Sequence, residues 1–452
     1  MLKSFLFLAV LFFVVPNAFG GFLYVVNDAT NGNTIYGFAV NEANGALTPL
    51  SGFPVSTGHA GAALSNLEML TIDKTNKRLY VVNRGAGNVS AYSIDEATGA
   101  LTPLAFSPIA AGVANPRTVD VHPSGSPLIV GGDTIGSINI AETATPAAGS
   151  PYTLQTGVSP AGSTLSVNGS YYYTGGNTGN FFSGYAVDAA TGVLTPLKGS
   201  PFDSGNQTPN PTTTDAAGRL FVINSRQALT RIYSTAAGIP AQASASPFAN
   251  GMAGFASQGK VHPNGGFFLL ADRTGARVSS YAISGSGEGT TLATVAGSPY
   301  ATGGSGSATM VFNESGNYLF VANGGARNLS IFKVSGSTGE LSDRVLLDTN
   351  ALGTAGVLTG IDYINFSSPA ISTNIIGQVL NSGRPVSRAT VRLTDGGGNV
   401  RTAITNAFGY FSFAEVMTGQ NVTLSATHKL HTFSPETVAV TANLSPVVLE
   451  AE

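Results

Sequence analysis

Short runs of alternating apolar and polar residues recur along the first three quarters of the chain. The motif Tyr-Val-Val-Asn at Tyr24 is repeated at Tyr80, and related runs follow with successive copies 44 to 56 residues apart. Alternation with a period of two indicates a strand with one buried face. Repetition at this spacing indicates a series of similar structural units. The seven copies start at Tyr24, Tyr80, Ile129, Tyr173, Phe221, Leu269 and Phe320.

Three further strand signals accompany most copies. An alternating run such as Thr-Val-Asp-Val at 118–121 precedes the motif, and an aromatic strand such as 89–94 follows it. The third signal is Leu-Thr-Pro after a Gly-containing turn, as at 101–103. Proline has no amide to donate, so this strand should lie at the edge of its sheet. Four strands per unit predict an all-β fold, a seven-bladed β-propeller over residues 21–366.

The two ends of the repeat region are complementary. The first unit begins directly at its second strand, while a spare alternating segment, 358–365, follows the seventh unit. We expect this segment to become the missing strand of the first blade, which closes the ring and removes a free sheet edge. The alternative is that the segment pairs with a neighbouring molecule and produces a polymer.

Residues 1–20 have the features of a secretory signal peptide. Lys3 is followed by an apolar run from Phe5 to Val15, then by Pro16 and small residues. The run is too short to span a bilayer by itself, and no later stretch is long and apolar enough to do so. We expect a secreted or cell-surface protein, with the periplasm as an alternative, and no transmembrane segment after cleavage. An uncleaved anchor is the other interpretation of this segment.

The pattern changes after a short linker, residues 367–371. About seven strand signals in the remaining 80 residues predict a small β-sandwich over residues 372–452. The run Gly377-Gln378-Val379 and the segment 405–413, Thr-Asn-Ala-Phe-Gly-Tyr-Phe-Ser-Phe, resemble the carboxypeptidase-regulatory-like (transthyretin-like) Ig-type domain. The resemblance implies a folding or interaction module and not a peptidase.

The repeats themselves resemble the YVTN-type propellers of the 6-phosphogluconolactonase-like lactonase family. The resemblance covers about residues 22–366 and rests on the Tyr-Val-Val-Asn motif and on segments 83–95 and 97–104. It implies polar turns at the mouth of the channel, with a base-activated water and a cation to stabilise the oxyanion. Asn83-Arg84-Gly85 matches one such turn, but Ala86 replaces its histidine, and Asp272-Arg273 matches a second turn in part. Of the Pro-Arg-His segment of the family, only Pro116-Arg117 remains, followed by Thr118.

Composition excludes several classes of function. Only 10% of the residues are charged and the net charge is −3, so the chain has no basic surface for a nucleic acid backbone. The chain has no cysteine, so no disulfide can stabilise the mature protein and no lipidated cysteine can anchor it to a membrane. We find no calcium loop, phosphate-binding loop or dinucleotide fingerprint, and expect neither a cofactor nor a metal. His428 and His431 lie near a strand end, where odd spacing predicts side chains on opposite faces.

The candidate site residues are few. Arg84, Asp272 and Arg273 are the best polar candidates, with ordinary surface ion pairing as the alternative. His122 and His262 occupy the same repeat position in His-Pro-Ser-Gly and His-Pro-Asn-Gly. A shared turn preference explains them, although they would lie on opposite walls of the channel mouth if the turns open there.

Three functions are compatible with these observations. We favour the first, a non-catalytic scaffold that binds an extracellular protein or a carbohydrate, because the repeat signals are many and the catalytic groups are few. The second is an exported lactonase-like hydrolase; convergence of Arg84, Asp272, Arg273, His122 and His262 on one pocket would support it, and a scattered arrangement would rule out a site built from these five residues. The third is a self-associating assembly subunit, in which segment 358–365 or the last strand near Val447 completes the sheet of a neighbour.

Overall fold

The computed structural model describes most of the chain in two units. One unit spans Phe19–Phe366 and the other Ser367–Glu452. The described residues are 20–64, 68–154, 160–176, 179–205, 208–235, 238–252, 254–347, 356–366, 372–395, 400–417, 421–440, 444 and 446–452. The predicted signal peptide, apart from Gly20, and the predicted linker 367–371 lie outside these ranges. Among the described residues, none forms a helix that is long and apolar enough to cross a bilayer.

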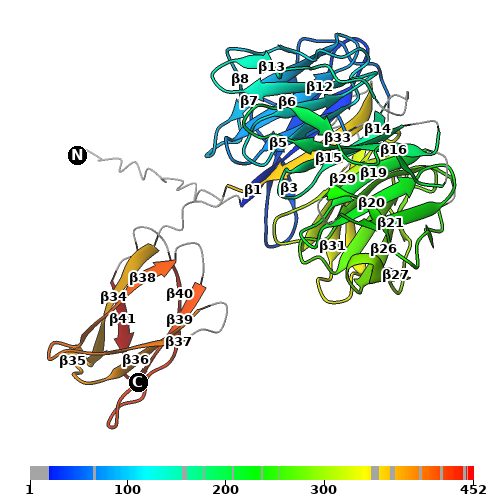
Figure 1. Ribbon diagram of the computed structural model, residues 1–452. Coiled ribbons are helices and arrows are strands. Elements are labelled where there is room, and N and C mark those ends of the chain that lie inside the picture. The colour runs from blue at the N-terminus through cyan, green and yellow to red at the C-terminus, as the bar shows by residue number, and fades with distance from the viewer. Residues whose placement is uncertain are drawn as a thin grey trace, which may run out of the picture. The chain divides into compact units, whose positions relative to one another are not determined.

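Seven antiparallel sheets form the first unit, and each is one blade of a propeller (Figure 1). From blade 1 to blade 7, the inner strands are β33 (Val357–Ile364), β5 (Leu70–Asp73), β10 (Thr118–Val121), β14 (Pro160–Leu165), β19 (Pro209–Thr214), β24 (Ala256–Val261) and β29 (Ser307–Phe312). The second strands, which carry the Tyr-Val-Val-Asn-type motif, are β1 (Gly21–Asp28), β6 (Arg78–Asn83), β11 (Leu128–Gly131), β15 (Tyr171–Gly176), β20 (Arg219–Asn224), β25 (Phe267–Asp272) and β30 (Tyr318–Asn323).

The outer half of each blade contains the aromatic and proline strands. The third strands are β2 (Thr34–Val40), β7 (Asn88–Ile94), β12 (Ile135–Ile140), β16 (Phe181–Val187), β21 (Leu229–Ser234), β26 (Arg277–Ser284) and β31 (Asn328–Val334). The fourth strands are β3 (Leu47–Pro49), β8 (Leu101–Pro103), β13 (Ala144–Pro146), β17 (Leu194–Pro196), β22 (Ala241–Gln242), β27 (Thr291–Thr294) and β32 (Leu341–Leu347). Five two-residue strands also pair with third strands: β4 (Val55–Ser56), β9 (Ile109–Ala110), β18 (Phe202–Asp203), β23 (Phe248–Ala249) and β28 (Tyr300–Ala301); a 3₁₀ turn lies at Gly287–Gly289. The Leu-Thr-Pro strands lie at sheet edges, as the missing proline amide requires.

The ring closes within the chain, which confirms the prediction for the segment after the seventh unit. β33 pairs antiparallel with β1 from Phe22↔Ile364 to Asp28↔Val357. In Figure 1 the yellow β33 accordingly lies beside the blue β1, although more than 300 residues separate them. β33 also contacts the inner strands β5 and β29 of the neighbouring blades. A single strand therefore completes blade 1 and seals the ring.

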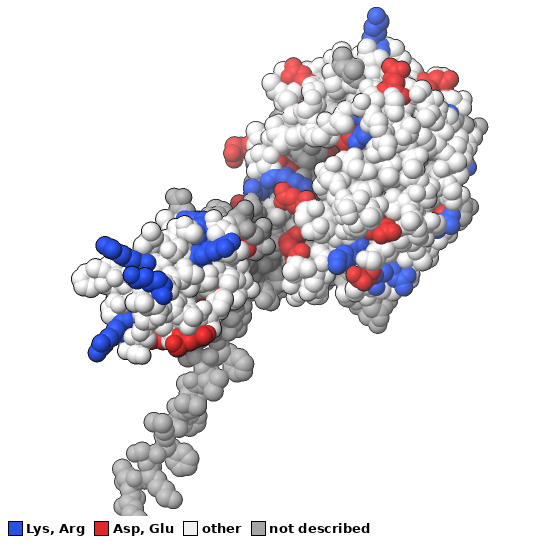
Figure 2. Space-filling view, turned by 90° about the horizontal axis from the view of Figure 1, so that it is seen from below, with Lys and Arg blue, Asp and Glu red and all other residues white. Residues whose placement is uncertain are grey.

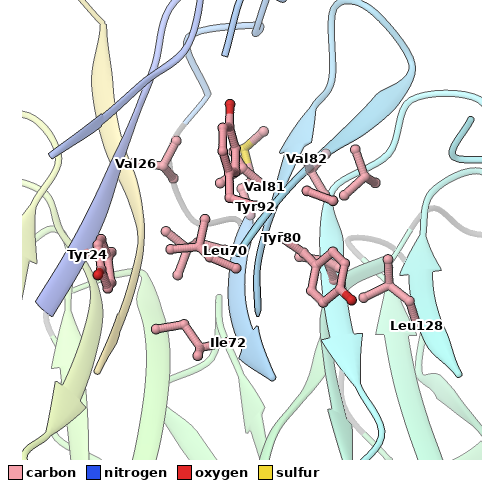
Figure 3. Close-up of a cluster of buried hydrophobic side chains, with 14 of the residues drawn as sticks. Tyr24, Val26, Leu70, Ile72, Tyr80, Val81, Val82, Tyr92 and Leu128 are labelled. Carbon is pink, nitrogen blue, oxygen red and sulfur yellow. The ribbon is translucent and has the colours of Figure 1, made fainter. Parts of the chain in front are cut away.

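Apolar side chains fill the space between neighbouring blades. Figure 3 shows this packing between blades 1, 2 and 3, where Leu70 and Ile72 lie between the side chains of Tyr24 and Tyr80. The alternation seen in the sequence thus places one set of side chains against each neighbouring sheet. This close packing explains why the apolar strand motifs repeat.

Hydrogen bonds from one blade to a turn of the next reinforce this packing. The Tyr24 hydroxyl donates to the carbonyl oxygen of Gly99 at 2.7 Å, and the Tyr173 hydroxyl donates to that of Gly238 at 2.6 Å. A serine has the same role in two other blades: Ser137 Oγ donates to Gly192 O at 2.6 Å and Ser280 Oγ donates to Gly339 O at 2.8 Å. The repeated Gly-containing turn is therefore a docking element between blades.

The second unit is a β-sandwich. One sheet contains β35 (Arg384–Pro385), β34 (Ser372–Asn381), β38 (Tyr410–Met417) and β41 (Val447–Glu450); the other contains β37 (Val400–Ile404), β36 (Thr390–Thr394), β39 (Asn421–Thr427) and β40 (Glu436–Ala439). The two sheets share one core, which includes Ile375, Phe411 and Leu424. β41 pairs in parallel with β34 of its own sheet.

Loss of an interblade hydrogen bond should destabilise the propeller. Tyr24→Phe leaves the buried carbonyl of Gly99 without its donor, and we expect the free energy of unfolding to fall by roughly 1–3 kcal/mol. Tyr233→Phe is the matched control, because the buried Tyr233 hydroxyl has no hydrogen-bond partner among the described residues. Urea unfolding of both variants measures the difference. Equal losses in the two variants would contradict the role assigned to the Tyr24 hydroxyl.

The contact between β33 and β5 should be equally sensitive to added volume. A Cβ atom at Gly360 would lie 2.9 Å from the Cβ and the backbone nitrogen of Leu70. We expect Gly360→Ala to lower the free energy of unfolding by about 1–3 kcal/mol, because overpacking forces the two strands apart. Gly289→Ala, where a Cβ would meet no atom within 4 Å, is the control and should change it little. Thermal melting of both variants decides the point.

Candidate functional site

The propeller has two faces that differ in their turns. Face 1 carries the turns between second and third strands, such as 84–87, and the starts of the inner strands. Face 2 carries the turns between inner and second strands, such as 122–127. Because neighbouring strands are antiparallel, each turn type stays on one face in all seven blades.

The final asparagine of the repeat motif is a structural residue on face 1. Asn83 Nδ2 donates to Asn88 Oδ1 and to Ser90 Oγ, both at 2.8 Å. In blade 7, Asn323 makes the same two contacts, with Asn328 Oδ1 at 2.8 Å and Ser330 Oγ at 2.7 Å. The motif therefore ends in asparagine because the side-chain amide forms hydrogen bonds across the turn to the third strand.

Asp272 occupies this same position in blade 6. It is fully buried, and its Oδ2 lies 2.9 Å from Arg277 Nε, while its Oδ1 accepts a hydrogen bond from the Gly275 amide. Arg277 pairs with Asp272 in the register in which Asn88 pairs with Asn83. An ion pair in blade 6 thus replaces the amide pair of blade 2. Asp272 therefore has a structural role, which is to stabilise the turn between the second and third strands.

Arg84 and Arg273 are equivalent residues in the turns of blades 2 and 6, and both lie on face 1. Each is partly exposed. Arg84 Nη1 is buried and has no hydrogen-bond partner among the described residues. Burial lowers the pKa of the Arg273 guanidinium. Burial likewise lowers the pKa of Arg117, which precedes β10 on the same face, and the nearby charge of Arg84 lowers it further.

His122 and His262 lie on face 2 and do not join the arginines. His122 is 8% exposed; its Nδ1 lies 2.8 Å from Ser124 Oγ and 3.1 Å from the Ser124 amide. His262 is 3% exposed, packs edge-on against Phe312, and has Nε2 3.1 Å from the Gly316 carbonyl. The convergence of all five candidates on one pocket is therefore wrong, since strand direction separates these turns from those of Arg84 and Arg273. Turn formation explains both histidines.

The histidine pair of the second unit also differs from expectation. His428 and His431 form an isolated bridge across a tight turn, and their rings stack with centroids 5.1 Å apart. The strand ends before His428, so strand alternation does not apply and the prediction of opposite faces is wrong. Across the described residues, no group of three or more His, Asp or Glu side chains is arranged to hold a metal ion.

The inner strands enclose a narrow polar cavity in the propeller channel. About 90 Å³ of it is accessible to the centres of water molecules, enough for several waters. Its charged and amide-bearing residues come from blades far apart in sequence: Glu68, Asp120, Gln258, Lys260 and Asp362. Only 10% of the residues are charged, and most of the face drawn in Figure 2 is accordingly uncharged, so five charged or amide side chains in one cavity are a notable concentration.

Glu68 lies at the face 1 end of this cavity. It lies two residues before β5, and the backbone carbonyl of Met69, the residue between them, accepts a hydrogen bond from the amide of Val82 near the end of β6. Its Oε1 accepts a hydrogen bond from Gln258 Nε2 at 2.5 Å, across the channel from blade 6. Burial raises the pKa of the Glu68 carboxyl to about 7, opposed by the nearby charge of Lys260. A carboxyl with this pKa exchanges protons near neutral pH.

Four other polar residues of the cavity lie at one level of the ring. Thr71, Asp120, Lys260 and Asp362 each pair with the first residue of the repeat motif in their blades. Burial raises the pKa of Asp120 to about 6, although Ser163 Oγ donates to its Oδ2 at 2.6 Å and Lys260 lowers it. Asp362 Oδ2 accepts from the Ile72 amide at 2.9 Å. Lys260, on blade 6, is the one cation among these four.

Sequence reasoning missed the channel residues, although a signal was present. Asp120, Lys260 and Asp362 are charged residues inside short apolar strands, in a chain with few charges, and they share one repeat position. Aligning the inner strands by that position would have identified them. Glu68 has no such signal, because its partner Gln258 is 190 residues away.

The sequence model of the family described as "Lactonase, 7-bladed beta-propeller" matches residues 13–145 and 228–348, more than half of the chain. The chain belongs to this lactonase family. No curated protein is significantly similar to it in sequence.

Solved structures share the lactonase propeller fold. A candidate 6-phosphogluconolactonase from Bacteroides fragilis is 18% identical, with a TM-score of 0.61 over 76% of this chain and 98% of that chain. A second candidate from Bacteroides uniformis is 16% identical, with a TM-score of 0.63 over 76% and 100%. A periplasmic gluconolactonase from Pseudomonas aeruginosa is 16% identical, with a TM-score of 0.59 over 76% and 99%. At this level of identity, the likeness establishes the fold.

Asp120, a partly buried carboxyl, should make a contribution to the stability of this lactonase-family propeller that falls as pH rises. Asp120 has a higher pKa in the folded protein than in the unfolded chain, so the folded protein binds more protons between about pH 4 and 7 and its free energy of unfolding falls across that window. Asp120→Asn should be more stable than the parent at pH 8 by roughly 1–3 kcal/mol and equally stable near pH 3. Urea unfolding at several pH values measures this difference.

Asp95→Asn provides a control of opposite sign. Asp95 is exposed, and hydrogen bonds from Thr98 lower the pKa of its carboxyl. Its contribution is therefore present at neutral pH and lost as the pH falls through its folded pKa. A difference between the parent and Asp120→Asn that does not depend on pH would contradict the assignment of Asp120.

Proposed function

We propose that this protein is an exported lactonase-like hydrolase whose reaction takes place where the channel opens on face 1. The observation that carries the proposal is Glu68, a carboxyl with a pKa of about 7 at the edge of a polar cavity, in a member of the lactonase family. General bases work best when their pKa lies near the operating pH. The gluconolactonase named among the structural neighbours supports the same class of substrate.

The reaction needs one water molecule and one carboxylate. Water attacks the carbonyl carbon of the lactone while Glu68 removes its proton, so a tetrahedral oxyanion forms. The ring C–O bond then breaks, and Glu68 returns the proton to the departing alkoxide oxygen. The product is the open hydroxy acid, and Glu68 ends in its starting state.

Arginines on face 1 supply the charge that the oxyanion requires. Arg84 is the best candidate, because it lies on face 1 and its Nη1 has no hydrogen-bond partner among the described residues. Arg273 stands in the equivalent turn of blade 6. Cationic donors placed where negative charge develops give a large part of the rate enhancement in acyl transfer.

Export and the second unit complete the proposal. Residues 1–20 act as the signal peptide, and a periplasmic gluconolactonase among the structural neighbours supports export. The sandwich at 372–452 acts as a carboxypeptidase-regulatory-like interaction module for an extracellular protein or a carbohydrate.

A non-catalytic binding scaffold is the second candidate function. Ala86 stands where the family resemblance leads us to expect histidine, and His122 and His262 are occupied in turns of face 2. A scaffold would therefore rely on the surface of the propeller and on the sandwich. Strand donation to a neighbour has less support, since β33 and β41 both pair within their own chain.

Hydrolysis assays with a panel of sugar lactones test the proposal. We expect turnover whose kcat/KM rises with pH to a plateau above about 7, because Glu68 must be ionised to act as the base. Glu68→Gln should lower kcat by about 10²-fold or more. Arg84→Ala should lower kcat by about 10²-fold, since the oxyanion loses a donor.

Asp95→Asn is the control for these variants, because Asp95 lies in an exposed turn between the third and fourth strands of blade 2. It should keep full activity. Glu68→Gln can still accept the Gln258 hydrogen bond, so loss of activity without loss of fold identifies a chemical role. A parent protein that hydrolyses no lactone in the panel would favour the scaffold.

A further inference from the structure

The side chain of Gln258 spans the channel with both ends of its amide fixed. Its Oε1 accepts a hydrogen bond from the Met310 amide of blade 7 at 2.6 Å. Its Nε2 donates to Glu68 Oε1 of blade 2 at 2.5 Å. Since a backbone amide can only donate, the oxygen of Gln258 must face Met310 and its NH₂ group must face Glu68.

The backbone of β24 places Gln258 in this position. The pairing register between β24 and β25 shifts between Ala256 and Gln258, which marks a β-bulge. The same shift occurs at this point of blades 1, 4 and 7, so the bulge belongs to the repeat, and the long amide side chain is what distinguishes blade 6. Gln258 is 4% exposed, so its amide is held in one arrangement. At the same level of other inner strands, Gly360 pairs with Val26 and Thr309 with Ala322, and neither side chain has this reach.

We propose that Gln258 is the positioning residue for Glu68 in the hydrolytic site. It occupies Oε1 of the carboxylate and leaves Oε2, which has no hydrogen-bond partner among the described residues, available to a water molecule in the cavity. This inference rests on the proposed function, because it assigns the orientation of the base in that reaction. Gln258 itself need not touch the substrate.

The charges around the cavity and the hydrogen bond from Gln258 both affect the pKa of Glu68. Lys260 of β24 favours the ionised form of Glu68, whereas Asp120 of β10 and Asp362 of β33 oppose it. The hydrogen bond from Gln258 also favours the ionised form, against the burial that raises the pKa to about 7. Loss of the donor should therefore raise the pKa of Glu68 and release its orientation at the same time.

Two substitutions test the effect of Gln258 on Glu68. Gln258→Met keeps the length of the side chain without a donor, and Gln258→Glu keeps an acceptor for the Met310 amide while placing a second carboxyl against Glu68. In the first variant we expect the pKa of Glu68 to rise by about one unit, and in the second by more, since two adjacent carboxyls share a proton. We expect kcat at pH 7 to fall about tenfold or more, with KM changed less than about threefold.

The measurements are the pH profile of kcat/KM and a ¹³C NMR titration of glutamate carboxyl carbons. The Glu68 signal is the one absent from Glu68→Gln. Thr309→Val is the control, because Thr309 lines the same cavity and its buried hydroxyl has no partner among the described residues. It should leave the titration of Glu68 unchanged.

The outcomes distinguish this inference from the function beneath it. An active parent whose Glu68 titration and kcat are the same in both Gln258 variants overturns the role of Gln258 and leaves the hydrolase intact. A parent without lactonase activity overturns the proposed function itself. A Glu68 pKa that rises together with a displaced acid limb and a lower kcat supports the positioning role, since a merely structural residue would not move the pH profile.

Discussion

Pairing between β33 and β1 is the contact on which the propeller depends. It joins residues near the two ends of the repeat region and converts an open row of blades into a ring. The channel follows from it, since β33 contributes Gly360 and Asp362 to the cavity and lies against β5 of the next blade. The bond between Glu68 and Gln258 crosses a space whose width is set by this closure. Geometry at the candidate site is therefore a property of the whole ring and not of any one blade.

In the channel, the same few residues that are useful for catalysis also lower the stability of the fold. Glu68 and Asp120 are carboxyls that burial holds toward the neutral form. Such groups weaken the folded state when they ionise, yet a carboxyl is useful as a base because it can ionise near neutral pH. The blades can tolerate this cost because their apolar faces pack against one another around the full circle, as in the contacts of Tyr24, Leu70 and Tyr80.

Local patterns were sufficient to predict the fold. Strand alternation, the Tyr-Val-Val-Asn motif and the proline strands gave the blades and the closing strand, because propeller blades are made largely of contacts close in sequence. The site could not be predicted in the same way. Asp272 looked like a site residue in isolation, but its equivalence to Asn83 and Asn323 shows that it stabilises a turn. His122 and His262 were correctly interpreted as turn residues. They lie on the face opposite Arg84, because the direction of the strands places the two kinds of turn on different faces. Glu68 could not be predicted as a site residue from the sequence, because its hydrogen-bond partner Gln258 lies on the opposite side of the ring.

Completion of blade 1 by β33 has a consequence for the order of biosynthesis. The first sheet to begin emerging from a ribosome or a secretion pore is the last to be finished, because its inner strand ends at Ile364. Until then, β1 presents an open hydrogen-bonding edge to whatever else is nearby. The ring therefore stays open during synthesis of all seven repeats. A chain that is truncated before residue 357 keeps the unpaired edge of β1, to which another strand can pair.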